Sequence, residues 1–194
     1  MPRHDCRPGE RARQRGYAAI VDPVRALGRA KAAWCLACAI ALSQLGVNQR
    51  ASCTITRVSD GDSVTCKPYG RVRLLSIDAP ELSDGELGRL ARDQLLAIVP
   101  VGTKVVAETD VRVKDQYGRV LAYLFLPGVG MVNERMAEIG YATALVYAPN
   151  VKYASRIRAA ASRARRAKRG FWGTGAFDCT PRDYRAGRCR LTNR

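Results

Sequence analysis

Histidine is almost absent from this sequence of 194 residues. The single histidine, His4, lies near the N-terminus. The remainder of the chain therefore has no imidazole base, nucleophile or metal ligand, which excludes histidine-dependent mechanisms. Any hydrolysis must use carboxylates, arginines and a metal-bound water.

A long apolar run is also missing. The most apolar segment, 32–47, has 16 residues and contains Ser43, Gln44 and Gly46, whereas a membrane-spanning helix needs about 20 residues. Its basic flank, apolar centre and small residues afterwards are typical of a secretory signal. We expect residues 1–50 to be a basic lead with a signal peptide, and the protein to be exported (periplasmic or secreted). An uncleaved membrane anchor at 32–47 is the alternative.

Acidic residues are few beside basic ones, and the formal net charge is +16. Residues 1–50 hold 9 Lys and Arg against 3 Asp and Glu, so residues 51–194 keep a net charge of +10. This excess favours a polyanionic partner, most simply nucleic acid, although charge that only maintains solubility is the alternative. The basic segment 152–169 has an alanine stripe at helical spacing and is open to two interpretations, a solvated face or a phosphate-binding one.

Four cysteines lie after residue 50: Cys53, Cys66, Cys179 and Cys189. No two of them form a C-x-x-C pair, and their wide spacing does not favour zinc. An even number suits an oxidising compartment. Three pairings are possible; we expect the two local ones, and the second would close the C-terminal tail, 176–194.

The hydrophobic pattern predicts strands and interleaved helices. Alternation or apolar runs bounded by turns indicate strands at 53–58, 63–67, 71–77, 104–108, 111–113 and 119–126. Helical spacing indicates helices at 86–99 and 132–139, and fits 152–169. The first helix is expected to bury a stripe made of Leu87, Leu90, Ala91, Leu95 and Val99. About five strands with three helices predict an α+β domain over 51–175, mainly a small closed or partly closed β barrel.

Two acidic segments bracket the strand predicted at 71–77. They are Ser59–Ser63 (SDGDS) and Asp78–Glu81 (DAPE), and the strand between them carries Arg71 and Arg73. Each segment ends an apolar run, where a rigid strand can aim side chains at one point, so we expect a metal-and-phosphate site. Plain alternation places Arg73 and Asp78 on opposite faces. If both serve one site, the strand must bend or bulge near Ser76.

Six ordered motifs resemble the thermonuclease, or staphylococcal nuclease-like (SNase-like), family. They are VSDGDSV at 58–64, VRLLSIDAPE at 72–81, DQYGR at 115–119, MVNE at 131–134, YAPN at 147–150 and FWG at 171–173. The resemblance spans roughly residues 53–173. It implies a five-stranded OB-fold barrel with three helices and calcium-dependent hydrolysis of DNA and RNA. We expect a monomer without a nucleotide cofactor.

The resemblance also implies a metal site. Asp62 and Asp78 would be carboxylate ligands of calcium, or of another divalent cation, together with the backbone carbonyl of Ala79. Oxygen donors of this kind suit a hard cation. Glu81 would orient or deprotonate the attacking water.

The same resemblance implies a substrate side. Arg73 and Arg119 would hold the phosphate with bidentate donors, and Tyr117 would contact a terminal phosphate. Tyr147 and Asp115 are further candidates for substrate binding, although Asp115 could merely cap the turn at 115–118.

Some positions depart from the family pattern. Leu145 lies where a nucleotide-contacting tyrosine is expected, and the segment 82–88 is shorter than its counterpart. Asp60 is interpreted as a turn former. The alternative to an enzyme is a non-catalytic OB-fold module that binds nucleic acid, exported or held at the membrane. A pure binder has no need of the acids, so their presence favours a nuclease.

Overall fold

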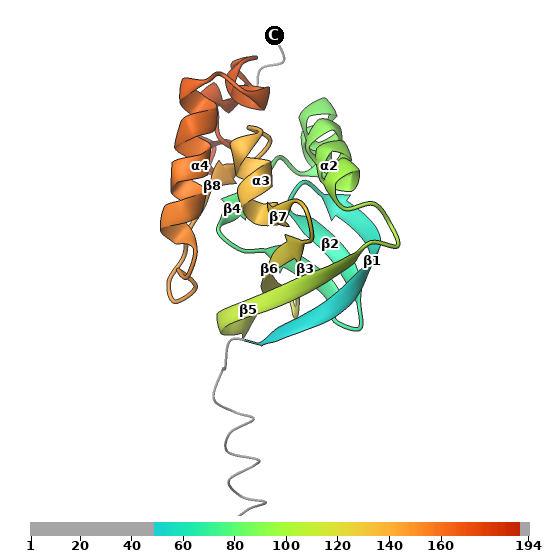
Figure 1. Cartoon of the computed structure of the whole chain (residues 1–194). Helices are drawn as coiled ribbons and strands as arrows, with labels where there is room; N and C mark the ends of the chain where they lie inside the picture. The colour runs from blue at the N-terminus through green and yellow to red at the C-terminus, as the bar shows by residue number, and fades with distance from the viewer. Residues whose placement is uncertain (1–48, 191–194) are drawn as a thin grey trace, which may run out of the picture. The chain divides into compact units, whose positions relative to one another are not determined.

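The computed structural model describes residues 49–190 (Figure 1). Its strands run β1 (Arg50–Asp60), β2 (Ser63–Lys67), β3 (Gly70–Leu74), β5 (Lys104–Lys114) and β6 (Val120–Leu126). They pair in the order β3-β2-β1-β5-β6, and parallel pairing of β3 with β6 closes the ring. The predicted five-stranded OB-fold barrel is confirmed.

An irregularity in β1 determines which of its side chains face the barrel interior. Cys53, Ile55 and Val58 of β1 are buried, although strict alternation would turn Arg57 inward. A register shift between Ile55 and Arg57 in the pairing with β2 places Val58 inside instead, as a β-bulge does. The expected Cys53–Cys66 disulfide joins the same two strands.

Two helices pack on the barrel, α2 (Glu86–Ile98) and α3 (Val132–Glu138), and a third, α4 (Ala154–Arg166), packs against α3. Figure 1 shows α3 between the other two, and α3 contacts both of them. Four members of the stripe predicted for α2 are buried, but Leu90 is 40% exposed, so that part of the prediction was wrong. On α4 the alanine stripe is buried, as its spacing predicted. The segments predicted at 104–108 and 111–113 form the single strand β5.

A buried carboxylate fixes the start of α4 to the barrel. Glu108 of β5 has no exposed surface. One of its oxygens accepts hydrogen bonds from Lys152 and from the Tyr153 hydroxyl, at 3.1 Å for the tyrosine, and the other accepts from Arg50 Nε at 2.5 Å. Burial alone would raise the pKa of Glu108, but the hydrogen bonds from Lys152, Arg50 and Tyr153 outweigh it and hold the pKa below its ordinary value.

The C-terminal residues are folded against the same core. The short helices η2 (Gly170–Trp172), η3 (Ala176–Asp178) and α5 (Pro181–Arg185) follow α4. Phe171 and Trp172 dock on the core, with ring centroids 5.1 Å and 5.0 Å from that of Phe177. The expected Cys179–Cys189 disulfide closes the loop that carries α5. Residues 176–190 are therefore part of the compact unit, and α5 was not predicted.

The predicted signal peptide or membrane anchor at 32–47 lies outside the described residues. Across residues 49–190, the helices are too short or too polar to cross a membrane.

Candidate active site

The backbone bends between β3 and β4 (Ile77–Asp78). Leu75 and Ser76 form a turn there, and Ser76 has a φ of 64°, a value uncommon for a residue with a side chain. The bend predicted near Ser76 is confirmed. It brings Arg73 and Asp78 to the same side of the chain, with Arg73 Nη2 3.5 Å from Asp78 Oδ1.

Several hydrogen bonds hold this strained turn. Arg73 Nη1 donates to the carbonyls of Leu74 (2.7 Å) and Ile77 (3.0 Å), one on each side of the turn. The side chain of Asn133, which α3 places with no exposed surface, donates to the Leu75 carbonyl at 2.9 Å. Such over-determination is what keeps a strained conformation populated. Asn133 of the MVNE motif thus helps to hold the turn at Leu75 and Ser76 in its conformation.

One guanidinium nitrogen joins the two aspartates. Asp62 lies in the turn between β1 and β2, and its Oδ2 is 2.9 Å from Arg73 Nη2, the atom that also faces Asp78. Asp62 Oδ2 accepts from the Ala79 backbone N–H at 3.0 Å, and its Oδ1 accepts from the Ser63 hydroxyl at 2.9 Å. Asp62 and Asp78 are only 5% and 1% exposed. The two acidic segments therefore converge on one point, as the sequence predicted.

Two glycines allow this convergence. A Cβ on Gly61 would lie 2.7 Å from the Cβ atoms of Ala79 and Ala91. A Cβ on Gly88 would lie 1.8 Å from the Glu81 carbonyl oxygen. Only glycine permits such close approach, so the turn at Asp62 and the start of α2 pack directly against the DAPE segment.

Glu81 is the most accessible acid of the site. It precedes η1 (Leu82–Asp84), and its side chain is 57% exposed. Asp60 Oδ1 accepts a hydrogen bond from the Leu82 N–H at 3.1 Å, so Asp60 ties the two acidic segments together. Because η1 leads directly into α2, the segment 82–88 forms a tight connection.

Arg185 is a site residue that sequence reasoning missed. From the end of α5, its Nη2 reaches Asp78 Oδ1 at 2.5 Å and Oδ2 at 2.6 Å, while Nη1 lies 3.7 Å from Glu81 Oε1. Burial raises the pKa of Asp78 above its ordinary value, although the hydrogen bond from Arg185 acts in the opposite direction. No motif marks Arg185, which lies 107 positions after Asp78 in the chain.

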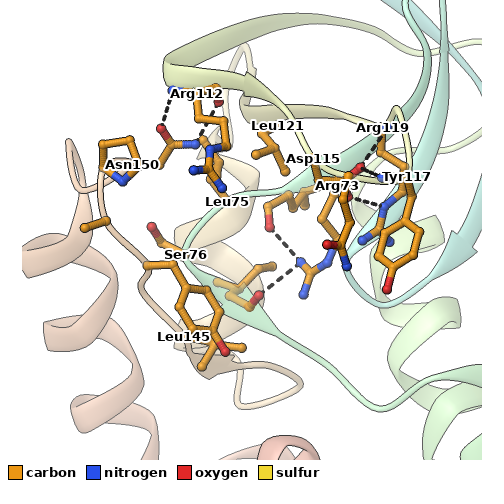
Figure 2. A pocket seen from close by; sticks show the side chains of 16 residues that line it. Arg73, Leu75, Ser76, Arg112, Asp115, Tyr117, Arg119, Leu121, Leu145 and Asn150 are labelled. Atoms are coloured by element: carbon orange, nitrogen blue, oxygen red, sulfur yellow. Dashed lines mark hydrogen bonds and ion pairs between the residues drawn. The ribbon is translucent and has the colours of Figure 1, made fainter.

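A cleft of about 490 Å³ opens beside the aspartates. It is lined by the predicted substrate-side residues Arg73, Asp115, Tyr117, Arg119 and Tyr147. Figure 2 shows the first four of these with Tyr117 beside Arg119. The metal-side residues Asp62, Asp78, Ala79 and Glu81 do not line this cleft. Arg73 contacts the two metal-side aspartates and also lines the cleft.

Asp115 closes the turn at 115–118, as expected, and also orients Arg119. Its Oδ1 accepts from the backbone N–H groups of Tyr117 and Arg119, both at 2.9 Å, and so closes the turn. Its Oδ2 accepts from Arg119 Nε at 2.7 Å and orients that guanidinium. Burial alone would raise the pKa of Asp115, but the hydrogen bonds from Arg119 and Tyr117 hold it below its ordinary value.

The far wall of the cleft comes from the YAPN segment. The buried Asn150 side chain accepts from the Arg112 N–H at 2.7 Å and donates to the Arg112 carbonyl at 2.8 Å, which ties this segment to β5. Tyr147 is 62% exposed at the rim. Leu145, where a tyrosine was expected, lines the cleft with an aliphatic side chain. Sequence reasoning also missed Arg112, a further cation of the lining.

A second cavity of about 430 Å³ shares Leu145 with the cleft. Arg158 and Arg165 of α4, Arg182 of α5 and Trp172 contribute to its lining. The guanidinium of Arg165 lies 5.3 Å from the centroid of the Trp172 ring. Among residues 49–190, these three arginines have no carboxylate partner within 4.0 Å.

Other arginines of α4 face a neighbouring helix. Arg156 lies 2.6 Å from Glu134 of α3, and Arg163 lies 3.8 Å from Glu138. The arginines of α4 therefore divide between two faces of one helix. One face forms ion pairs with α3, and the other lines a cavity.

The predicted cation ligands fit a hard divalent cation by their chemistry. Within the part of the chain that the structure describes, no cluster of three or more His, Cys, Asp or Glu side chains forms a ready-made metal site. The predicted set has only two such side chains, Asp62 and Asp78, with a backbone carbonyl. Both carboxylates reach one atom, Arg73 Nη2, and oxygen donors are what calcium prefers.

Comparison with known proteins gives the family. A family model described as staphylococcal nuclease homologue matches residues 71–174. A thermonuclease of Staphylococcus hyicus is 36% identical over 61% of this chain and 73% of its own length, and one of Staphylococcus intermedius is 34% identical over 61% and 74%. An uncharacterized endonuclease of Escherichia coli is 33% identical over 45% of this chain and 57% of its own. The chain therefore belongs to the staphylococcal nuclease family.

Proposed function

We propose that this protein hydrolyses DNA and RNA by attack of a water molecule on the phosphodiester, with a divalent cation, foremost calcium, at Asp62 and Asp78. The observation that carries the proposal is the position of Arg73, whose guanidinium contacts both aspartates and lines the arginine-bearing cleft. A phosphodiester held in that cleft would lie between Arg73, which connects it to the two aspartates, and Arg119.

The protein is a nuclease, a hydrolase of phosphodiester bonds with nucleic acid as its substrate. This sets aside the alternative of a module that only binds. The cation would be held by the two aspartates and the Ala79 carbonyl, and when bound it supplies a Lewis acid for a phosphoryl oxygen. Glu81, exposed and next to these ligands, takes the proton of the attacking water.

Two arginines stabilise the charge that develops on the phosphoryl oxygens. Asp115 fixes the Arg119 guanidinium at the cleft wall, so its donors are preorganised for those oxygens. Arg73 is fixed by two backbone carbonyls. Tyr117 and Tyr147, 65% and 62% exposed at the cleft, offer aromatic faces to the flanking nucleotides.

The decisive assay measures cleavage of single-stranded DNA and of RNA by the purified protein, with calcium and with a chelator. Chelation is expected to abolish cleavage, and Glu81→Gln to lower kcat at least a hundredfold. Exposed Glu86 of α2 provides the control, because Glu86→Gln removes the same charge outside the site. Cleavage that survives chelation, or undiminished cleavage by Glu81→Gln, would contradict the mechanism.

The second cavity extends the proposed path of the polynucleotide. Because it meets the cleft at Leu145, Arg158 and Arg165 would bind phosphates beyond the scissile one. Arg158→Ala/Arg165→Ala should lower the salt-dependence slope of binding to single-stranded DNA by about 1.4, or 0.7 per contact. The matched variant, Arg156→Ala/Arg163→Ala, removes arginines that pair with α3 and should keep the slope. If the two double variants had the same salt-dependence slope, α4 would not be part of the path of the polynucleotide.

We also propose that the protein is exported and monomeric. The two disulfides support an oxidising compartment. The mass of the protein recovered from outside the cytoplasm would show whether residues 1–50 are removed, and a membrane-bound product of full mass would favour the anchor. Sedimentation would give the oligomeric state.

A further inference from the structure

Arg185 lies where a cation would have to bind. Its Nη2 contacts both oxygens of Asp78, at 2.5 Å and 2.6 Å, and its Nη1 faces Glu81. Asp78 is buried while the Arg185 side chain is 37% exposed, so the arginine reaches inward to the acid. It comes from outside residues 71–174, the part that the family model matches.

The loop that carries Arg185 is anchored at its base and exposed at its tip. Ala176 and Phe177 are buried in the core, and the Cys179–Cys189 disulfide joins the ends of the loop. Thr180 caps α5 by accepting from the Asp183 N–H at 3.3 Å. Residues 184–188 are exposed. This arrangement keeps Arg185 close to the site and lets the end of α5 move without disturbing the core.

A guanidinium that contacts both oxygens of a carboxylate competes with a divalent cation for them. Both oxygens of Asp78 are within hydrogen-bond distance of Arg185, and the positive charge also repels an approaching cation. Asp62 has Arg73, Ala79 and Ser63 as further partners. Asp78 also faces Arg73 at 3.5 Å, but Arg185, at 2.5 Å and 2.6 Å, is the nearer competitor that a cation must displace.

We propose that Arg185 is an active-site residue of this protein that competes with the catalytic cation for Asp78. Cation binding displaces Arg185 from Asp78 and moves the end of α5 away from the site, so the C-terminal loop sets the cation affinity of the enzyme. This inference rests on the proposed role of Asp78 as a cation ligand. It adds a determinant of cation affinity from outside the family region.

The test measures calcium binding by calorimetry on the full chain without substrate. Arg185→Gln keeps a polar side chain and removes the charge. It should bind calcium roughly ten- to a hundredfold more tightly than the wild type, the effect expected for losing a charged hydrogen-bonded competitor. Arg182→Gln on the same helix is the matched control. Arg182 is exposed and has no ion pair among residues 49–190, so this variant should stay within about threefold of the wild type.

A second readout follows the loop itself. Hydrogen–deuterium exchange in residues 181–188 should rise when calcium saturates the wild type, because α5 loses its contact with Asp78. In Arg185→Gln the exchange should already be high without calcium. Exchange that does not change on calcium binding, or calcium binding that is equal or weaker in Arg185→Gln, would overturn the inference.

Asp78→Asn separates this inference from the proposed function. If Asp78→Asn no longer binds calcium, while the wild type and Arg185→Gln bind calcium with equal affinity, only the role of Arg185 is refuted. If Asp78→Asn binds calcium as the wild type does, the ligand assignment fails, and the inference fails with it.

Discussion

Glu108 and Asp78 are both buried carboxylates that meet two cationic side chains, yet their protonation equilibria shift in opposite directions. The pKa of Glu108 is lowered because Lys152, Arg50 and Tyr153 together outweigh its burial. The pKa of Asp78 is raised because its burial outweighs Arg185 and Arg73.

The difference separates a structural acid from one held ready for a ligand. Glu108 has three hydrogen-bonding side chains, Arg50 from β1 and the neighbouring Lys152 and Tyr153 from before α4, and it lines neither cavity. For Asp78, which lies beside an arginine-lined cleft, the arginine partners do not fully offset the cost of burying the negative charge. An acid with a perturbed pKa in that position is typical of a functional site. A divalent cation would offset the buried negative charge of Asp78.

The largest expected effect is on stability. Glu108→Gln should lower the free energy of unfolding by about 3–5 kcal/mol, because the buried side chain loses the charge that accepts hydrogen bonds from Lys152, Arg50 and Tyr153. Urea denaturation at pH 7 measures it. Exposed Glu86 serves as the reference, since Glu86→Gln should change stability by less than about 0.5 kcal/mol. A Glu108→Gln variant as stable as the wild type would show that the network contributes nothing.

The same acid-to-amide change at Asp78 should harm activity and spare stability. Asp78→Asn is expected to lower kcat/KM at least a hundredfold, or about 3 kcal/mol, through loss of a cation ligand. In a chelating buffer its melting temperature should rise by a few degrees, because the neutral amide lacks the desolvation penalty of the ionised carboxylate. A fall in melting temperature comparable to that of Glu108→Gln would abolish the distinction.

Asp115 tests an acid between these two extremes. Asp115→Asn keeps a side-chain oxygen for the turn but loses the charge that orients Arg119. We expect a drop in kcat of roughly tenfold, about 1.4 kcal/mol, with a nearly unchanged KM. Single-turnover kinetics would measure it. A drop as large as that of Asp78→Asn would place Asp115 among the groups that act directly on the phosphate.

The smallest effect is on the pH dependence of stability. Because the folded-state pKa of Glu108 is lowered, its stabilisation is fully present above the unfolded value of about 4.3 and disappears as the pH falls through the folded value. The stability difference between wild type and Glu108→Gln should therefore shrink from pH 6 towards pH 3. Unfolding curves across that range measure the difference, and a constant value would contradict the lowered pKa.

Local patterns were sufficient for most of the fold. The turn residues and alternation predicted β2, and the bulge in β1 left its predicted strand intact. The pattern failed at Leu90, which has helical spacing for the buried stripe but an exposed side chain. Apolar spacing identifies a face, whereas the width of the covered face depends on the neighbouring elements.

The candidate site was likewise predicted from the sequence only in part. Ordered motifs predicted the acids, Arg73 and the cleft residues, and the need for one site predicted the bend at Ser76. Arg112 and Arg185 carried no signal, because nothing in their neighbouring residues distinguishes them from other basic side chains in a chain of net charge +16.

The sequence by itself determined the family, the closed barrel and the acids that a hydrolase without a nearby histidine must use. Only the tertiary structure decided which charges meet. It paired Glu108 with Lys152 and Arg50, split the arginines of α4 between two faces, and brought Arg185 to Asp78. The physical reason is that local sequence fixes backbone conformation over a few residues, whereas ion pairs depend on distances set by the packing of the whole chain.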